Sequence, residues 1–301
     1  MLCPLCENVD TYLADKIPID KIKTAWAKKF EIEVFSDIVG LTNVELYSCS
    51  ACGLKFYYPF TLAGGADLYE KLNKKDLYYQ KEKWEFFLAV RDIRGIEKLM
   101  EIGCGEGKFL RLAYENGVKE AAGIEICGSA IECGRKNGFN VDNISLEKAS
   151  HEYEGYFDAV CAFQVLEHSS TPRSFIENCL KMLKSNGKFI LAVPNSESYL
   201  KNIFLLLDMP PHHVTKWSAE TLKKLCDIFP LKLVKLKQEP LAENQVNFFI
   251  DSVFESLTNI GLPNFLLGGY SRKAMWLFCQ NRWVRRFLRG QTIYACYTKL
   301  R

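Results

Sequence analysis

The chain has 301 residues, of which 48% are hydrophobic and 25% charged, so it can bury a full core and form about two domains. Its formal net charge of +3 is too small to indicate nucleic-acid binding by itself. No stretch reaches the roughly eighteen apolar residues of a membrane span, the start does not resemble a signal peptide, and the 12 cysteines therefore indicate reduced thiols and metal in a cytoplasmic protein.

The amino-terminal segment contains two C-x-x-C knuckles, Cys3 to Cys6 and Cys49 to Cys52. The first has a proline inside and the second is followed by a glycine, which is typical of a zinc ribbon. Two knuckles supply four thiolates, and a closed tetrahedral shell leaves no position for water, so the metal would be structural. We predict a zinc-ribbon domain over residues 1–60 with a core of its own. Iron in the same site, or two unrelated cysteine pairs, are the alternatives.

An aromatic segment follows the ribbon and continues to about residue 94, with Tyr69, Trp84 and Phe86 among its large side chains. Aromatic residues at helical spacing usually face a core. We therefore expect residues 61–94 to form a helical linker between the ribbon and a second, larger domain over residues 95–301.

The larger domain opens with a short apolar run that ends in the sequence EIGCGEGKF, residues 101–109. Alternate glycines at 103, 105 and 107 let a ligand approach the backbone, and the free amides of the following helix start add donors. A dinucleotide fingerprint needs its third glycine one position later, where this chain has Lys108. The carboxylate of Glu101 would repel a pyrophosphate but suits the ammonium and sulfonium groups of S-adenosylmethionine.

A second predicted strand ends in Glu125, about twenty residues after the glycine loop. An acid at this place can accept hydrogen bonds from the two hydroxyls of a ribose. Dinucleotides and S-adenosylmethionine both need such an acid, so Glu125 supports a nucleoside ligand without separating the two.

Three later segments extend this pattern, and with them the chain resembles the class I S-adenosylmethionine-dependent methyltransferases over roughly residues 85–240. Residues 143–149 resemble the segment that frames the adenine. Residues 156–168 resemble the fourth strand and its "vLEH" loop, and residues 183–191 the "LkpGG" turn into the fifth strand. Asn186 replaces the usual glycine of that turn, but asparagine also tolerates a positive φ.

This resemblance implies a Rossmann-like, doubly wound α/β fold with a mostly parallel seven-stranded sheet. It places the methionyl end of the cofactor on the glycine loop, its ribose on Glu125 and its adenine near Ser145 and Leu146. Tyr78 and Tyr79 resemble the region where a helix can close over the cofactor in small-molecule methyltransferases, and are candidates for binding substrate. The cofactor-binding candidates are Glu101, Gly103, Cys104, Gly105, Gly107, Phe109, Glu125, Ile126, Ser145, Leu146, Phe163 and Gln164.

Helices and strands alternate in the carboxyl-terminal part of the chain. A helix is predicted from Pro172 to about Lys184, and Ser218 is expected to cap another that continues to about Phe229. Strands follow at 231–238 and 292–299. The segment between these strands, residues 243–290, is too long for a hairpin connection and is predicted to form inserted helices.

The four histidines differ in position. His151 follows the adenine segment and is expected to be a solvated bystander. His168 ends the "LEH" loop at the strand edge where open α/β sheets bind ligands, and either holds that loop or acts in catalysis. His212 and His213 lie in a segment that resembles the "PPHH...fs" loop over the acceptor pocket of related methyltransferases. An imidazole there can accept a proton near neutral pH. In an extended loop only one of the two could enter the pocket.

We therefore predict a methyltransferase that aligns a small-molecule acceptor for in-line attack on the methyl group of S-adenosylmethionine, leaving S-adenosylhomocysteine. Residues 163–166 lack the Asn/Asp-Pro-Pro-aromatic motif of nucleic-acid amino-methyltransferases. An RNA methyltransferase is nonetheless an alternative, and so is a cofactor-free scaffold without catalytic activity. The RNA alternative rests partly on the zinc ribbon, which also precedes the methyltransferase domain in ribosomal RNA methyltransferases. It also depends, like peripheral membrane contact, on one helix over residues 275–289 with arginines on one face, namely Arg282, Arg285, Arg286 and Arg289. The acceptor, the methylated atom and the oligomeric state stay open.

Overall fold

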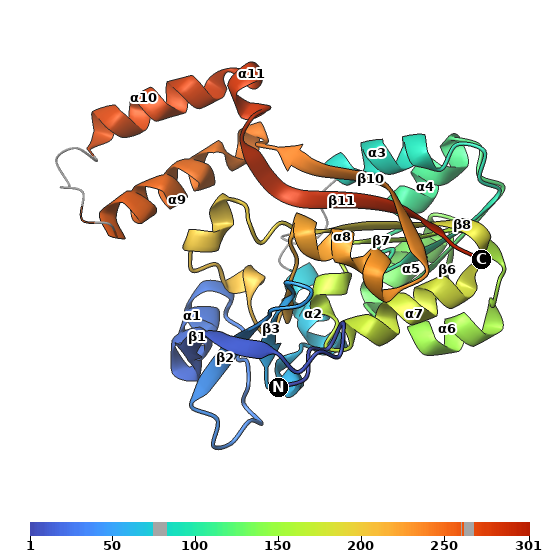
Figure 1. Cartoon of the computed structure of the whole chain (residues 1–301), viewed down its shortest axis with the longest axis horizontal. Helices are drawn as coiled ribbons and strands as arrows, with labels where there is room; N and C mark the ends of the chain where they lie inside the picture. Colours follow the sequence, from blue (N-terminus) through green and yellow to red (C-terminus); the bar gives the residue numbers. More distant parts are fainter. Residues whose placement is uncertain (75–82, 260, 262–267) are drawn as a thin grey trace.

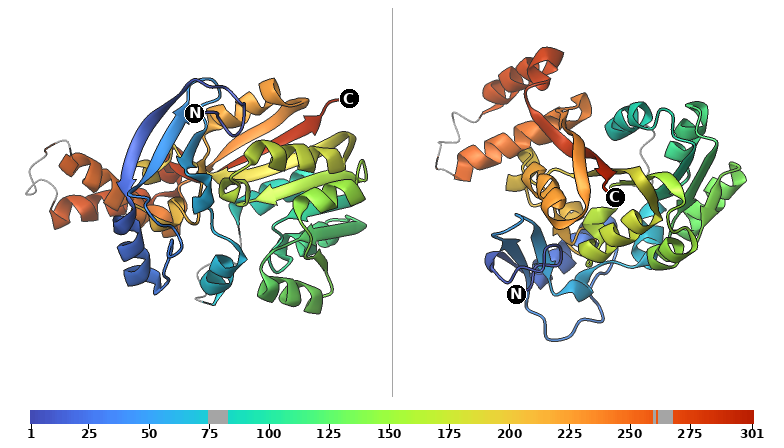
Figure 2. Two further views of the ribbon diagram at one scale, coloured as in Figure 1. Left: turned by 90° about the horizontal axis from the view of Figure 1, so that it is seen from below. Right: turned by 45° about the vertical axis from the view of Figure 1, so that its right-hand side comes forward.

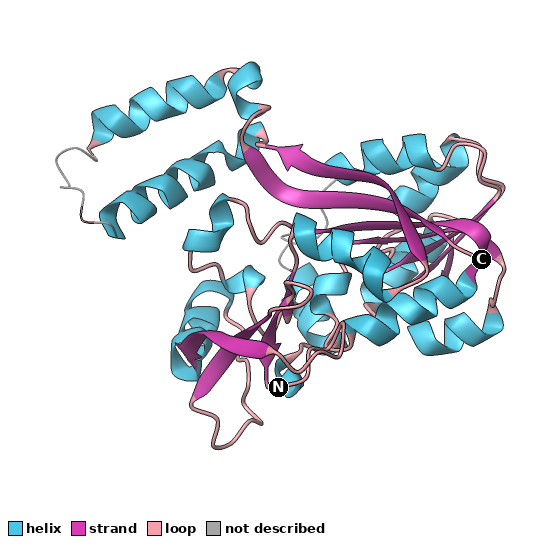
Figure 3. Ribbon diagram, in the orientation of Figure 1, coloured by secondary structure: helices cyan, strands magenta, loops and turns pink. Residues whose placement is uncertain are grey.

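The computed structural model describes residues 1–74, 83–259, 261 and 268–301. Its strands form two sheets, a seven-stranded sheet in the order β10-β11-β8-β7-β4-β5-β6 and a four-stranded sheet in the order β1-β2-β3-β9 (Figures 1 and 3). The larger sheet carries the cavity described below, and the smaller sheet belongs to the amino-terminal part of the chain.

The seven-stranded sheet confirms the predicted fold class. Five neighbouring strands, from β8 to the β6 edge, pair in parallel, and β11 and β10 add antiparallel at the opposite edge. Asn186 has φ 63° in the turn at the start of β8, as its position predicted. The strands are β4 (Lys98–Ile102), β5 (Glu120–Ile124), β6 (Asn140–Asp142), β7 (Phe157–Phe163), β8 (Leu183–Pro194), β10 (Leu231–Pro240) and β11 (Arg289–Lys299).

Helices cover both faces of this sheet because successive strand residues point to opposite sides. Leu99 of β4 packs with α3, α4 and α5, whereas Met100 packs with α6, α7 and α8. The predicted starts of two helices are confirmed: Pro172 opens α7, and the Ser218 hydroxyl accepts from the Thr221 amide at 3.1 Å before α8. The helices are α3 (Trp84–Asp92), α4 (Lys108–Glu115), α5 (Gly128–Lys136), α6 (Leu146–Glu152), α7 (Pro172–Met182) and α8 (Ala219–Ile228).

The amino-terminal unit is an antiparallel sheet with one helix packed on it. Trp26 and Phe30 of that helix lie in an apolar cluster with neighbouring strand residues, but the cluster also contains Leu206 and Met209 from the larger domain, so the small core is not fully separate. The fourth strand, β9, comes from far along the chain. The elements are β1 (Thr11–Pro18), α1 (Ile19–Phe30), β2 (Asn43–Cys49), β3 (Lys55–Tyr58) and β9 (Thr215–Lys216), followed after β3 by η1 (Phe60–Leu62) and α2 (Ala66–Asn73).

The knuckle cysteines do not belong to that small core. Cys3, Cys49 and Leu54 lie in the same apolar cluster as Trp217 and Leu222 of the larger domain. The expectation that the ribbon has a fully separate core is therefore wrong, because a unit of this size leaves apolar knuckle residues that only a neighbouring helix layer can cover. The proposed boundaries near residues 60 and 94 stay predictions.

The segment between β10 and β11 is helical, as predicted. It contains η5 (Glu243–Gln245), α9 (Val246–Asn259), α10 (Gly269–Gln280) and α11 (Arg282–Arg285). Figures 1 and 2 show α9 and α10 side by side, projecting beyond one end of the sheet. No described helix is long and apolar enough to cross a membrane.

The single helix expected over residues 275–289 does not form. α10 ends at Gln280, α11 contains only two of the four arginines, and Arg289 starts β11. Arg285 turns inward, where its guanidinium donates to the carbonyl oxygens of Cys279 and Gln280 at 3.0 and 2.8 Å. Asn281, whose side chain accepts from the Trp283 amide, breaks the helix and ends the arginine stripe on which the RNA alternative partly depended.

Candidate functional site

A cavity of about 870 Å³ opens at the carboxyl ends of the central strands. Gly103 follows β4, Glu125 follows β5, and Gln164 follows β7 on this edge. This is where open α/β sheets bind their ligands. The opposite wall comes from the segments 205–213 and 239–245 and includes Leu207, Asp208, His212, His213, Glu239 and Leu241.

The glycine loop needs glycine for its own backbone and packing. Gly103, Gly105 and Gly107 have φ values of 68°, 53° and 80°, in the left-handed region that disfavours other residues. A Cβ at 103 would lie 2.4 Å from Val165 Cγ2, and one at 107 would lie 2.5 Å from the ring of Phe139. The loop is therefore fixed by close contacts with two neighbouring elements.

Glu125 ties this loop to the end of β5. Its carboxylate accepts from the backbone amides of Gly105, Ile126 and Cys127 at 2.9, 2.7 and 3.0 Å. The side chain also lines the cavity. One carboxylate thus joins two strand ends and faces the ligand space.

The predicted cofactor residues divide into two groups. Those that line the cavity are Gly103, Glu125, Ile126, Ser145, Leu146, Phe163 and Gln164. The others lie in the glycine loop or in the core behind it and are absent from the described cavity lining; they are Glu101, Cys104, Gly105, Gly107 and Phe109. The Ser145 hydroxyl accepts from the Lys148 amide at 3.1 Å as the cap of α6. Their roles toward a cofactor stay predictions.

Glu101 illustrates this second group. Its side chain is 3% exposed, and no described residue hydrogen-bonds its Oε2 atom. Burial raises the pKa of Glu101 well above its ordinary value, so the carboxyl is held neutral inside the sheet. A carboxyl in this state stabilises a nearby cation only after it ionises.

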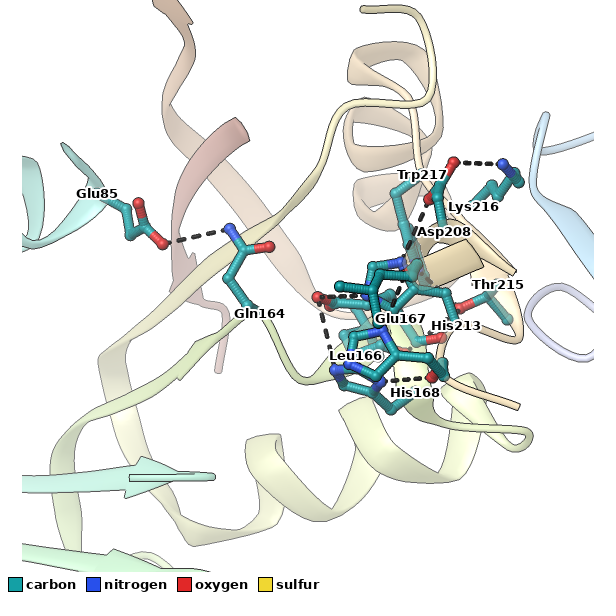
Figure 4. Close-up of polar contacts among 12 residues, drawn as sticks. Glu85, Gln164, Leu166, Glu167, His168, Asp208, His213, Thr215, Lys216 and Trp217 are labelled. Carbon is teal, nitrogen blue, oxygen red and sulfur yellow. Dashed lines mark hydrogen bonds and ion pairs between the residues drawn. The ribbon is translucent and has the colours of Figure 1, made fainter. Parts of the chain in front are cut away.

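Gln164 is held in a strained conformation at the end of β7. Its φ is 59°, in the left-handed region, and its amide nitrogen Nε2 donates to Glu85 Oε1 of α3 at 3.2 Å (Figure 4). Glu85 was not among the predicted site residues, because an acid in the first turn of an amphipathic helix carries no signal that distinguishes a cavity residue.

Three histidines meet at one wall of the cavity. The ring centroids of His168, His212 and His213 lie 4.5 to 4.9 Å apart. His212 and His213 stack at an interplanar angle of 25°, and both line the cavity. The expectation that only one of them enters is wrong, because both backbone amides bond to the Met209 carbonyl in a turn, so the loop is not extended.

Each of these rings is oriented by a bond at Nδ1. Nδ1 of His168 donates to the His212 carbonyl oxygen at 2.6 Å, and Nδ1 of His212 donates to the Leu207 carbonyl oxygen at 2.8 Å. Nδ1 of His213 donates to Asp208 Oδ1 at 3.2 Å. Asp208 also pairs with Lys216 (Figure 4). Carbonyls and carboxylates only accept, so Nδ1 of each ring carries the donated proton, and Nε2 is the nitrogen left for another partner.

The sequence analysis assigned no role to Glu167, which lies beside these rings. Its Oε1 atom is 3.9 Å from Nε2 of both His168 and His213, and Figure 4 shows both lines converging on the carboxylate. Burial raises the pKa of Glu167 to about 8 and lowers that of His168 to about 3, the latter with a smaller contribution from His213. Both groups are therefore uncharged near pH 7.

Two other candidates are placed differently. Tyr78 and Tyr79 fall outside the described residues, so their role in binding substrate stays a prediction. His151 lies at the exposed end of α6, where its Nδ1 is 2.8 Å from Lys181 Nζ, consistent with a solvated bystander.

The sulfur atoms of the four knuckle cysteines come together in the amino-terminal part of the chain. The sulfur of Cys3 lies 3.7 Å from that of Cys52, and the sulfur of Cys6 lies 3.5 Å from that of Cys49. Zinc bound tetrahedrally at about 2.3 Å holds its sulfurs about 3.8 Å apart. The spacing therefore fits one four-thiolate ion.

The fold is that of Rossmann-like methyltransferases. A family model described as "Methyltransferase domain" matches residues 70–236, more than half of the chain, and the chain belongs to this family.

Curated relatives named "Ubiquinone biosynthesis O-methyltransferase" match part of the chain. That of Pseudomonas aeruginosa is 28% identical over 185 residues, which cover 53% of this chain and 79% of the relative. That of Erwinia tasmaniensis is 27% identical over 115 residues, 36% of this chain and 47% of the relative. The chain thus spans about half the length of some curated relatives that it matches.

Two solved structures share the fold. One is an S-adenosylmethionine-dependent methyltransferase from Archaeoglobus fulgidus, with 21% identity and a TM-score of 0.50 over 77% of this chain and 99% of that one. The other belongs to the complex of a Haloferax volcanii methyltransferase with its activator Trm112, with 15% identity and a TM-score of 0.52 over 78% and 98%.

Proposed function

We propose that the protein uses S-adenosylmethionine to methylate an oxygen atom of a small-molecule acceptor. The observation that carries this proposal is that Gly103 of the glycine loop, Glu125 and the histidine cluster line one and the same cavity. Membership of the methyltransferase family and the O-methyltransferase names of the curated relatives support it.

The cavity residues that follow the central strands fit the cofactor. Gly103 presents backbone without a side chain, and Ile126 and Leu146 supply apolar surface for an adenine. A carboxylate has about four lone-pair sites, so Glu125 keeps one for a ribose hydroxyl after its three amide bonds. When bound, S-adenosylmethionine supplies an electrophilic methyl group on a sulfonium. The volume of about 870 Å³ is near the upper limit for single-ligand pockets, which leaves room for an acceptor.

The residues of the opposite wall fit an acceptor with an apolar body and an ionisable hydroxyl. Leu205, Leu207 and Leu241 line this wall, and the histidine cluster lies among them. Burial keeps His168 and His212 neutral, since it lowers both pKa values. A cluster of imidazoles at this wall can hold and orient the acceptor hydroxyl toward the methyl group.

We also infer that Cys3, Cys6, Cys49 and Cys52 hold one structural zinc ion. The spacing of their sulfur atoms supports this, and three of the four side chains are buried. Zinc there would fix the two knuckles against α7, whose Arg173 guanidinium donates to the Leu5 carbonyl at 3.1 Å.

Calorimetry with S-adenosylhomocysteine and transfer of a labelled methyl group test the function. We expect saturable binding, and label incorporation into phenols or other hydroxylated apolar compounds but not into total RNA. Absence of binding would contradict the proposal and favour the scaffold alternative. Incorporation into RNA alone would favour the RNA alternative.

A further inference from the structure

We infer that His168, His212 and His213, with the Glu167 carboxyl beside them, form a binding site for a divalent transition metal of the zinc class, with one coordination position open to the cavity. Metal binding itself follows from the geometry of this cluster alone. Its use to hold and activate the acceptor oxygen rests on the proposed function.

The donor atoms are close enough for one ion. Each of the three histidines offers a ring nitrogen, and these nitrogens all lie within 4.8 Å of one another. Zinc bound tetrahedrally at about 2.0 to 2.1 Å holds its nitrogens about 3.4 Å apart. The rings would therefore need to approach by at most about 1.4 Å, the difference between these two values.

The rings are oriented as metal ligands are. A histidine that binds a metal through one nitrogen almost always donates its other N–H to a carbonyl or carboxylate, which fixes the tautomer. Here Nδ1 of His168 and of His212 donates to a backbone carbonyl, and Nδ1 of His213 to Asp208. This set leaves Nε2 as the coordinating atom in every ring.

Glu167 places a buried carboxyl beside the three imidazoles, and a bound cation would favour its ionised form. Its side chain is 1% exposed, and no other described residue hydrogen-bonds either of its oxygens. A buried carboxyl without a partner is costly. Yet the chain around it is tightly fixed, since the Val214 amide donates to the Glu167 carbonyl at 2.9 Å and the Thr215 hydroxyl at 3.3 Å. A cation bound between His168, His213 and this carboxyl group would explain why the carboxyl is buried there without a hydrogen-bond partner among the described residues.

The donor set selects the class of ion and its use. Imidazoles suit zinc and neighbouring transition metals more than magnesium or calcium. Three histidines with an open position form a site that binds water or substrate oxygen. An acceptor hydroxyl bound there would replace water and release its proton to solvent, because the cation lowers the pKa of the bound oxygen.

Cobalt(II) titration of the full chain tests this site. A weak chelator first removes accessible metal while the four-cysteine zinc stays, and loss of that zinc in Cys49→Ser identifies it. We expect one further cobalt ion per chain, with a visible d–d band and without the thiolate charge-transfer absorption of cysteine ligation.

Four variants locate the ion. His168→Ala and His213→Ala should each weaken cobalt binding about 100-fold or more, while Asp208→Asn, which loosens the His213 ring, should weaken it roughly 10- to 100-fold. His151→Ala, on the exposed end of α6, is the matched control and should bind cobalt as the wild type does. S-adenosylhomocysteine affinity shows whether each variant is folded.

Absence of bound cobalt in the wild type, or unchanged cobalt affinity in the histidine variants, would overturn the site. If an alanine variant loses its fold, Glu167→Gln, which keeps the side-chain shape, carries the test and should also weaken binding. Absence of S-adenosylhomocysteine binding by the wild type would instead refute the proposed function. Failure of the metal site and failure of the proposed function are therefore distinguishable.

Discussion

Glu125→Gln is the most informative single substitution, because Glu125 joins the glycine loop to β5 through three amide donors. In its better orientation the glutamine oxygen keeps the bonds to Ile126 and Cys127, while its NH2 group faces the Gly105 amide, donor against donor. One hydrogen bond to a charged acceptor is lost, worth about 1.5 to 3 kcal/mol of stability. The acceptor for the ribose is also weakened, so cofactor affinity should fall by about 1 to 3 kcal/mol, or roughly 5- to 150-fold.

Urea unfolding and calorimetry with S-adenosylhomocysteine measure these two effects on the same protein. Glu120→Gln is the matched control, since Glu120 begins the strand that Glu125 follows and lies at the opposite edge, paired with Lys98. It should leave cofactor affinity unchanged. Wild-type stability and affinity in Glu125→Gln would refute the assignment of Glu125 as the link between loop and ligand.

Three further substitutions test other parts of the structure. Cys49→Ser should abolish the structural zinc and lower Tm of the whole chain by about 5 °C or more in calorimetry, because the knuckles share the main core; an unchanged Tm would argue for separate cores. The pKa of Glu101 in the folded protein is above its ordinary value of 4.5, so its contribution to stability is full below that pH and is lost as the pH rises. Glu101→Gln should therefore flatten the decline of the unfolding free energy above about pH 4.5. Parallel plots of unfolding free energy against pH for the variant and the wild type would contradict this. Gly107→Ala should destabilise more than Gly138→Ala, since both have positive φ but only the first Cβ meets Phe139; equal free energies of unfolding would show that φ alone matters.

Most of the fold was predictable from local sequence signals. The parallel strands are short apolar runs, the glycine loop and Glu125 mark the ends of β4 and β5, and Ser218 caps a helix as such residues do. Local signals failed where a contact joins distant segments. The pairing of β3 with β9 spans about 160 residues, and the sharing of one core by both parts of the chain follows from it.

The site was predictable residue by residue but not in its arrangement. His168, His212 and His213 were candidates because of their places in the chain, yet the turn that brings the last two to the same side is a backbone feature that the residue types did not reveal. Glu167 carried no signal of its own, since an acid in a strand-following loop is usually solvated. Its importance comes from burial between two imidazoles, which only the tertiary structure establishes.

The amino-terminal unit contributes directly to the acceptor side of the cavity. The Tyr57 amide donates to the Val214 carbonyl at 2.9 Å, and the Gly64 amide donates to the Pro211 carbonyl at 2.8 Å, so the segment after β2 holds both ends of the loop that carries His212 and His213. Cys49 is the last residue of that same β2 strand. An ion bound by the cysteines therefore stabilises the sheet against which the histidine loop is fixed. Loss of the structural zinc should disturb acceptor binding before it disturbs the glycine loop, since Gly105 and Glu125 make no contact with this sheet among their described hydrogen bonds.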